Sequence, residues 1–210
     1  MKPTPNAADA ERTAAPVKCS TCEALCEVPF ACEDCHQLLA HVQGANYFEL
    51  FGLPQSYEVD IALLEERYLA ISRNIHPDKF ATAGEEMQAF ALRASASVNS
   101  AYDVLRDPLH RAEYLLESSG GKSATQDKRV PQDLLAQVLM LREELEEAKA
   151  SGDRAMVDGV RVRVTHRKQA TEQTIATVCR DLNAASTQTK DELRLQLNAM
   201  KYLNNLLAQM

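Results

Sequence analysis

The stretch LEERYLAISRNIHPDKF, residues 64–80, decides the fold class of this chain. Its apolar side chains recur at helical spacing on one face, at Leu64, Tyr68 and Ile71. That spacing predicts an amphipathic helix over residues 63–75. Pro77 restricts the backbone of the residue before it, so the helix must end at His76.

A second helix is predicted after Gly84, because apolar residues again recur at spacings of three and four. The side chains expected to be buried there are Phe90, Ala94, Val98, Ala101, Tyr102 and Leu105. The motif His76–Phe80 therefore lies in a loop between two helices, which should pack antiparallel against each other.

The composition favours helix throughout the chain. It has 210 residues, enough for one large domain or two small ones, with 7 Gly and no Trp. Ala and Leu are abundant and β-branched runs are short, which favours helix over sheet. We therefore expect an all-α fold.

Charge and hydropathy argue against nucleic-acid and membrane partners. The net charge of -7 repels phosphate backbones and anionic lipids. No apolar run approaches the roughly 20 residues that cross a bilayer. The first 18 residues lack the apolar core of a secretory signal and are a poor match to a mitochondrial leader. We expect a cytoplasmic protein if the chain is bacterial and a mitochondrial one if it is eukaryotic.

Changes in composition divide the chain into five parts. The sequence Ser118-Ser119-Gly120-Gly121-Lys122-Ser123 interrupts every periodic pattern and indicates a linker. The predicted parts are a disordered tail (1–17), a Cys-rich module (18–40), a helical hairpin domain (46–117), a linker (118–130) and a C-terminal helical domain (131–210).

The C-terminal part is predicted to be a small antiparallel bundle of three amphipathic helices. Pro131 suits the first position of the first helix, which ends at Ser151-Gly152-Asp153, where Asp153 can cap the next. The other two helices are expected at about 154–183 and 189–209. The first helix carries apolar residues at Leu134, Leu135, Val138, Leu139, Leu141, Leu145 and Ala148.

Five of the six Cys residues fall within residues 19–35 and predict a metal site. Two C-x-x-C pairs supply the ligands Cys19, Cys22, Cys32 and Cys35. Two such pairs complete the tetrahedral set of a structural zinc ion, and the metal would supply the folding energy of so short a segment. Iron remains an alternative metal.

The other thiols and nearby imidazoles are assigned other roles. Cys26 is interpreted as a bystander, although it can replace a ligand, and His36 and His41 are close enough to compete. A thioredoxin-like dithiol is disfavoured because no strand precedes either pair. Cys179 is expected to be a small buried residue of the bundle.

Around the His76–Phe80 motif the sequence resembles the J-domain family. The similarity includes Asn46 to Leu53 (NYFELFGL), Leu64 to Tyr68 (LEERY) and Asn99 to Pro108 (NSAYDVLRDP), in that order. The resemblance implies that His76, Pro77 and Asp78 engage a DnaK/HscA-type chaperone ATPase.

The chemistry of the loop residues is consistent with binding to a chaperone ATPase. Pro77 limits the entropy of the loop, and the carboxylate of Asp78 can accept a bidentate hydrogen bond from a partner arginine. A basic surface beside the loop would attract an acidic partner; its residues are Arg67, Arg73 and Lys79. The alternative is a plain helix-ending turn beside a solvated charged face.

The arrangement of a J-like segment followed by a bundle resembles the HscB family of iron–sulfur cluster co-chaperones. Arg111 to Leu116 (RAEYLL) and Leu141 to Leu145 (LREEL) match as well, and some relatives carry a similar tetracysteine module. The resemblance covers about residues 46–210. It implies an oligomerisation and scaffold-binding role for the bundle.

The scaffold-binding face implied by the HscB resemblance consists of Leu135, Leu139, Glu143, Glu147 and Tyr202. Ala136 is smaller than the family's usual residue, and Met140 stands where an acid is common, so we expect either a lower affinity or an altered surface on the partner. The alternative is that Leu135 and Leu139 belong to the bundle core, since core residues show the same periodicity.

These observations predict a co-chaperone and not an enzyme. It would stimulate the ATPase of the chaperone and deliver an IscU-like iron–sulfur scaffold protein to it. One alternative is a general J-domain protein that binds unfolded clients, which the absence of a Gly/Phe-rich region argues against. Another is a metal-dependent redox sensor that uses the J-like segment as a scaffold.

Overall fold

The computed structural model describes residues 17–19, 21–26, 32, 34–35, 45–82 and 84–210. Most of the predicted tail, together with His36 and His41, lies outside the described residues. Contacts divide the chain into two compact units, Met1–Pro108 and Leu109–Met210, and each is described by itself.

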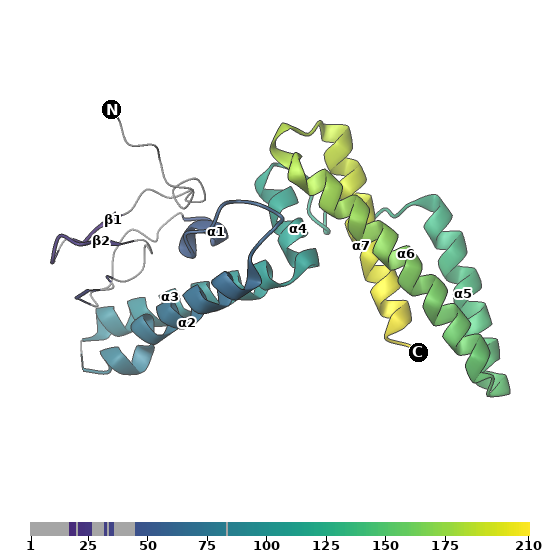
Figure 1. The fold of residues 1–210 in the computed structure, drawn as a ribbon, viewed down its shortest axis with the longest axis horizontal. Helices are drawn as coiled ribbons and strands as arrows, with labels where there is room; N and C mark the ends of the chain where they lie inside the picture. The colour runs from purple at the N-terminus through teal and green to yellow at the C-terminus, as the bar shows by residue number, and fades with distance from the viewer. Residues whose placement is uncertain (1–16, 20, 27–31, 33, 36–44, 83) are drawn as a thin grey trace, which may run out of the picture. The chain divides into compact units, whose positions relative to one another are not determined.

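The helical part of the first unit is a hairpin preceded by a short helix (Figure 1). Its elements are α1 (Tyr47–Leu50), α2 (Ile61–Ile75), the 3-10 helix η3 (Pro77–Phe80) and α3 (Glu85–Arg106). Asp60 begins α2 by accepting hydrogen bonds from the backbone N–H groups of Ala62 and Leu63. The predicted end of α2 at His76 and the start of α3 after Gly84 are both confirmed.

Apolar side chains of α1, α2 and α3 form the core of the hairpin, among them Phe48, Leu64, Ile71, Ile75, Ala94, Val98, Ala101 and Leu105. Two residues predicted to be buried, Phe90 and Tyr102, are only half-buried. The Tyr102 ring stacks on that of Tyr68 with centroids 4.0 Å apart, and the Tyr68 hydroxyl donates to Asn99 Oδ1 at 3.1 Å. This edge of the hairpin is therefore aromatic and polar.

The Cys-rich module contains a small antiparallel ribbon, which the sequence patterns do not predict. Strand β1 (Val17–Lys18) pairs with β2 (Leu25–Cys26), with Val17 opposite Cys26. Because β1 directly precedes Cys19, the expectation that no strand precedes either C-x-x-C pair is wrong for the first pair. Glu23 closes the turn between them with a φ of 62°, a left-handed conformation that is uncommon outside glycine. The ribbon positions Cys19 and Cys22 in one tight turn.

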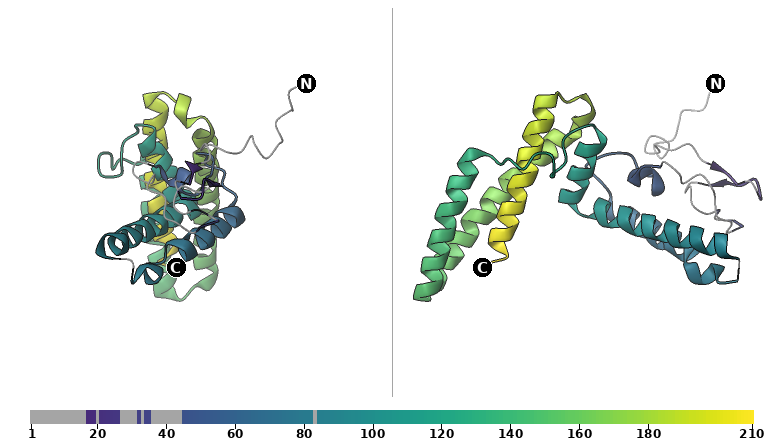
Figure 2. Two further views of the ribbon diagram at one scale, coloured as in Figure 1. Left: turned by 90° about the vertical axis from the view of Figure 1, so that its left-hand side faces the viewer. Right: turned by 180° about the vertical axis from the view of Figure 1, so that it is seen from behind.

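The second unit is a helical bundle (Figure 2). Its elements are α4 (Pro108–Ser118), α5 (Gln132–Ser151), α6 (Arg154–Arg180), the 3-10 helix η4 (Leu182–Ala184) and α7 (Thr187–Leu207). One core cluster joins α5, α6 and α7 through Leu134, Val138, Leu145, Val160, Val164, Ala199, Leu203 and Leu206. The predicted all-α fold with a C-terminal three-helix bundle is confirmed.

The ends of the bundle helices differ slightly from the predictions. Pro131 is the N-cap of α5 and not its first helical residue; its carbonyl accepts from the Leu134 N–H at 3.1 Å. Gly152 ends α5 with a φ of 70°, and Asp153 caps α6 through the Met156 N–H, as predicted. Helix α6 stops at Arg180, because η4 replaces its expected last turn.

Helix α4 packs within the second unit. Its Glu113 accepts hydrogen bonds at 2.8 Å from Arg194 and from Lys201, both on α7. The predicted range 46–117 places α4 in the hairpin domain, whereas the contacts divide the chain between Pro108 and Leu109. That residues 46–117 form one domain stays a prediction.

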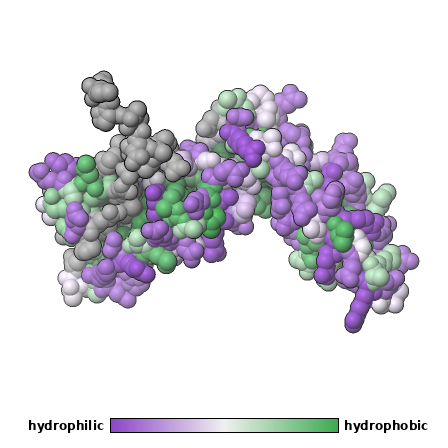
Figure 3. Space-filling model, in the orientation of Figure 1, coloured by the Kyte–Doolittle hydropathy of each residue, from purple (hydrophilic) through white to green (hydrophobic). Residues whose placement is uncertain are grey.

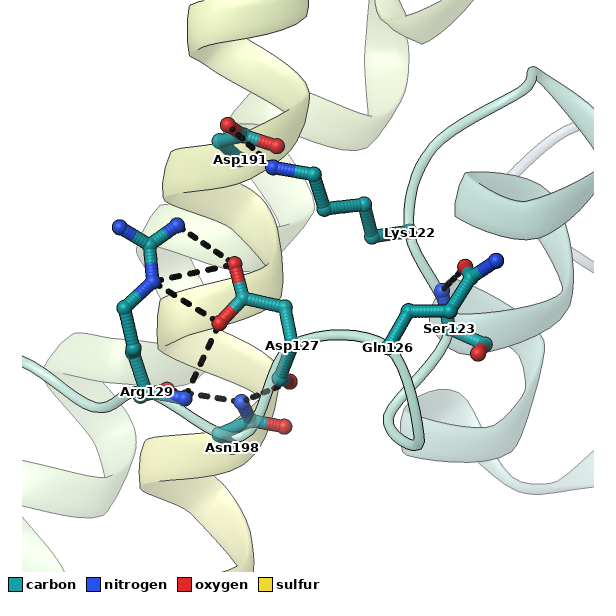
Figure 4. A network of polar contacts seen from close by, with 7 residues as sticks. All are labelled: Lys122, Ser123, Gln126, Asp127, Arg129, Asp191 and Asn198. Carbon is teal, nitrogen blue, oxygen red and sulfur yellow. Dashed lines mark hydrogen bonds and ion pairs between the residues drawn. The ribbon is translucent and has the colours of Figure 1, made fainter.

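The segment between α4 and α5 is held against α7 (Figure 4). Asn198 donates from its side-chain amide to the carbonyls of Asp127 at 2.9 Å and Arg129 at 2.7 Å. Lys122 forms an ion pair with Asp191 at 2.9 Å. The predicted linker is thus an ordered strap of the bundle in this structure. Among the described residues, we find no helix with the length and apolar character needed to cross a membrane.

Candidate functional site

The His76–Phe80 loop presents an acidic side chain at the tip of the hairpin. Pro77 begins η3, and the Nδ1 atom of His76 accepts from the Asp78 N–H at 3.3 Å, which caps this turn. The Asp78 side chain is 89% exposed and lies 3.4 Å from His76 Nδ1. The carboxylate is therefore exposed to solvent, and its role in binding a chaperone stays a prediction.

The three basic residues predicted beside this loop differ in exposure. Arg73 and Lys79 are both exposed. Arg67 is half-buried, and its Nη1 donates to the carbonyls of Phe51 at 2.6 Å and Gly52 at 2.7 Å. Arg67 thus ties α2 to the turn after α1, a structural task that the sequence patterns do not reveal.

A second candidate surface lies on α5 and consists of Leu135, Leu139, Glu143 and Glu147, which we call the α5 stripe. Leu135 is 43% exposed and Leu139 is 60% exposed, while both acids are exposed. Their neighbours Leu134 and Val138 occupy the core instead. The alternative that the two stripe leucines are core residues is therefore wrong.

Met140 and Tyr202 are two further exposed large side chains of the bundle. Met140 on α5 is 62% exposed, and Tyr202 on α7 is 40% exposed. Leu203, next to Tyr202, shares a core cluster with Leu134, next to Leu135. On the face drawn in Figure 3 the second unit is mostly hydrophilic with small separate apolar areas.

The four predicted metal ligands come together. The Sγ atoms of Cys19, Cys22, Cys32 and Cys35 all lie within 4.8 Å of one another. Cys19 and Cys35 are 3.5 Å apart, and Cys22 and Cys32 are 3.4 Å apart. Four thiolates bound tetrahedrally at about 2.3 Å from zinc lie about 3.8 Å from one another. The donor set therefore fits a single metal ion.

Backbone N–H groups aim at these sulfurs and change the acidity of the thiols. The N–H of Cys35 lies 3.5 Å from the Sγ of Cys32 and is the main cause that lowers the pKa of Cys32 to about 6. The N–H groups of Cys22 and Thr21 likewise lower the pKa of Cys19. At Cys22 the Ala24 N–H lowers the pKa, but contacts with Cys32 and Cys35 outweigh it and raise the pKa to about 12.

Of the two remaining thiols, Cys179 is buried as predicted, and the bystander role of Cys26 stays a prediction. Cys26 is buried and lies outside the group of four, with its Sγ 3.7 Å from the Ala24 carbonyl. Cys179 is buried in α6, and burial raises its pKa to about 12. A thiol of that acidity is mostly protonated at neutral pH and is a poor nucleophile or ligand.

A scan against family models matches residues 130–210 to the HSCB C-terminal oligomerisation domain. A co-chaperone protein HscB homolog of Vibrio vulnificus is 37% identical over 153 residues, which cover 71% of this chain and 87% of that relative. The chain belongs to the HscB family. A Vibrio cholerae homolog with the same description is 45% identical over 109 residues, or 51% of this chain. That alignment spans only 64% of the relative's length.

Solved HscB structures have the same fold. Chaperone HscB from Vibrio cholerae aligns with a TM-score of 0.65 at 33% identity, over 79% of this chain and 94% of that chain. Human co-chaperone protein HscB aligns with a TM-score of 0.72 at 25% identity, over 92% of this chain and 96% of that chain. The resemblance to J-domain co-chaperones of the HscB type is thus confirmed, and a co-chaperone role follows from it.

Proposed function

We propose that this HscB-family chain stimulates ATP hydrolysis by a DnaK/HscA-type chaperone and delivers an IscU-like iron–sulfur scaffold protein to it. The proposal includes a cytoplasmic location in a bacterium. The observation that carries it is the pair of exposed surfaces: the Asp78 carboxylate on the hairpin and the α5 stripe on the bundle. A co-chaperone that recruits a client to an ATPase needs one surface for each.

The chaperone would be recognised through the hairpin. Asp78 can accept a bidentate hydrogen bond from an arginine of the ATPase, and such charge-assisted bonds are strong and directional. Arg73 and Lys79 would add electrostatic steering toward an acidic face, which mainly raises the association rate. The partner, and not this chain, would carry out the hydrolysis.

The scaffold would be recognised through the bundle. Leu135, Leu139 and Tyr202 offer exposed apolar surface of the kind that forms an interface hot spot. Glu143 and Glu147 would form an acidic rim and favour a basic patch on the scaffold. Met140, the exposed neighbour of Leu139 in the chain, stands where an acid is expected, which would suit a less charged contact on the partner.

The tetracysteine site would hold one zinc ion. Its four sulfurs have the spacing and the N–H hydrogen bonds of a closed thiolate site, which suits zinc in a structural role. The ion would fix the turn at Cys19–Cys22 against the turn at Cys32–Cys35. Bound metal would also keep all four thiols ionised at neutral pH.

An ATPase assay with Asp78→Asn tests the chaperone half of the proposal. The wild-type chain should raise the turnover of a purified DnaK/HscA-type chaperone, and Asp78→Asn should lose nearly all of this stimulation. Glu65→Gln, which neutralises an exposed acid elsewhere on α2, is the matched control and should keep it. Equal stimulation by wild type and Asp78→Asn would contradict the proposal.

A further inference from the structure

Two side chains of α3 hold the two ends of the His76–Phe80 loop. Ser95 donates from its hydroxyl to the carbonyl of Ile75 at 3.2 Å, just before the loop. Gln88 donates from its side-chain amide to the carbonyl of Ala81 at 2.7 Å, just after it. The two residues are seven apart, close to two full turns, so they lie on one side of α3. In Figures 1 and 2, α2 and α3 run side by side over their length.

The Ile75 carbonyl lies where the helix leaves an acceptor without a partner. Ile75 ends α2, and the last carbonyls of a helix have no partner within it. In a continued helix the N–H of Lys79 would reach Ile75, but here it donates to the His76 carbonyl at 3.0 Å. The Ser95 hydroxyl therefore donates to the Ile75 carbonyl in place of the Lys79 N–H, which donates to His76 instead.

The two anchors enclose the turn that carries Asp78. Inside it, His76 Nδ1 accepts from the Asp78 N–H, and the Ala81 N–H lies 3.4 Å from the Asp78 carbonyl. The backbone on both sides of Asp78 is thus tied to α3 or to itself, while the carboxylate stays exposed. A binding group held in this way loses less conformational freedom when a partner docks.

We propose that Gln88 and Ser95 are positioning residues, which hold the loop in the conformation that the chaperone ATPase binds. This inference rests on the proposed function of Asp78. Without the anchors the loop would populate other conformations, and the apparent dissociation constant would rise by the inverse of the competent fraction. The maximal stimulated turnover should stay the same, because Asp78 itself is intact.

The test compares the full chain with a Gln88→Glu/Ser95→Ala double variant in the same ATPase assay. Gln88→Glu keeps the shape but removes the N–H donor, and Ser95→Ala removes the hydroxyl. We expect the concentration for half-maximal stimulation to rise about tenfold at unchanged maximal turnover. Ser95→Thr, which keeps a hydroxyl, and Ser97→Ala, an exposed serine of the same helix, should both stay within about twofold of wild type.

Hydrogen exchange of the free chain separates positioning from loss of fold. The Lys79 and Ala81 amides should exchange faster in the double variant, while the amides in the middle of α2 and α3 should keep their protection. A double variant with wild-type half-maximal concentration would overturn the positioning role and leave the proposed function intact. If the wild-type chain gives no stimulation, the proposed function fails and the positioning role fails with it.

Discussion

The side-chain amide of Asn198, on α7, donates to the backbone carbonyl of Asp127 at 2.9 Å, 71 residues earlier in the chain. Asn198 is 5% exposed, and it also donates to the carbonyl of Arg129. One buried side-chain amide thus holds the strap, the segment between α4 and α5, against α7 (Figure 4).

Replacing this amide should loosen the bundle. Asn198→Ala removes two hydrogen bonds, each worth about 0.5–1.5 kcal/mol, so we expect a loss of about 1–3 kcal/mol in the free energy of unfolding. Urea titration followed by circular dichroism measures it. Asn205→Ala, at an exposed position of the same helix, should cost less than about 0.5 kcal/mol. Equal midpoints for the two variants would show that the hydrogen bonds of Asn198 contribute nothing to stability.

The bundle should also lose stability in acid. Hydrogen bonds from the side chain and backbone of Arg129 hold the pKa of Asp127 well below its ordinary value. At Glu113 burial raises the pKa, but hydrogen bonds from Lys201 and Arg194 outweigh it and lower the pKa. A carboxylate whose pKa is lowered by folding stabilises fully above its unfolded pKa, about 4, and this stability is lost as pH falls toward the folded value.

The free energy of unfolding should therefore fall steeply below about pH 5. Asp127→Asn cannot titrate, so its stability should depend less on pH between about 5 and 2. Urea unfolding of both proteins at a series of pH values measures the two slopes. A variant with the same slope as wild type would mean that Asp127 has no shifted pKa.

Much of the helical architecture follows from the sequence, because apolar spacing and Pro and Gly residues act locally. Pro77 and Gly84 bracket the loop, and Gly152 with Asp153 separates two bundle helices as predicted. The hydrogen bonds between distant segments cannot be predicted from the sequence. Asn198 and Arg67 act over 71 and 16 residues, and nothing in the local pattern distinguishes them from other polar residues on a helix.

The candidate sites, like the fold, can be predicted only in part from the sequence. The C-x-x-C spacing predicts the four cysteines whose sulfurs lie together, because the members of each pair are only three residues apart. Periodicity cannot tell whether Leu139 or Val138 faces the core, since both continue an apolar pattern, and only the packing of α5 on its neighbours decides it. Gln88 and Ser95 carry no sequence pattern at all, because their role depends on where α3 lies beside the loop.

The structural role of Arg67 can be separated from partner binding. Arg67→Met removes two charge-assisted hydrogen bonds to the Phe51 and Gly52 carbonyls and should cost about 1–3 kcal/mol in stability, given its partial exposure. Arg73→Met, at an exposed site, should leave stability within about 0.5 kcal/mol but slow association with the chaperone. Thermal unfolding and stopped-flow binding measure the two effects. An Arg67→Met protein as stable as wild type would contradict the structural role of Arg67.

Metal content should depend on the thiols of Cys19, Cys22, Cys32 and Cys35 and not on that of Cys26. Native mass spectrometry should find one zinc per wild-type chain and per Cys26→Ser chain, and little in Cys22→Ser. Stripping the metal with a chelator should leave the helical circular dichroism nearly unchanged, because the ligands lie outside both helical cores. Loss of zinc from Cys26→Ser would mean that Cys26 is a ligand.

Calorimetric titration with an IscU-like scaffold protein shows whether this chain binds such a scaffold through the bundle. We expect a micromolar dissociation constant, about 8 kcal/mol of binding free energy, for wild type. A Leu135→Ala/Leu139→Ala/Tyr202→Ala variant should lose most of it, while Val162→Ala, a 68% exposed apolar residue of α6, should not. No binding by wild type, or equal loss in both variants, would contradict the account.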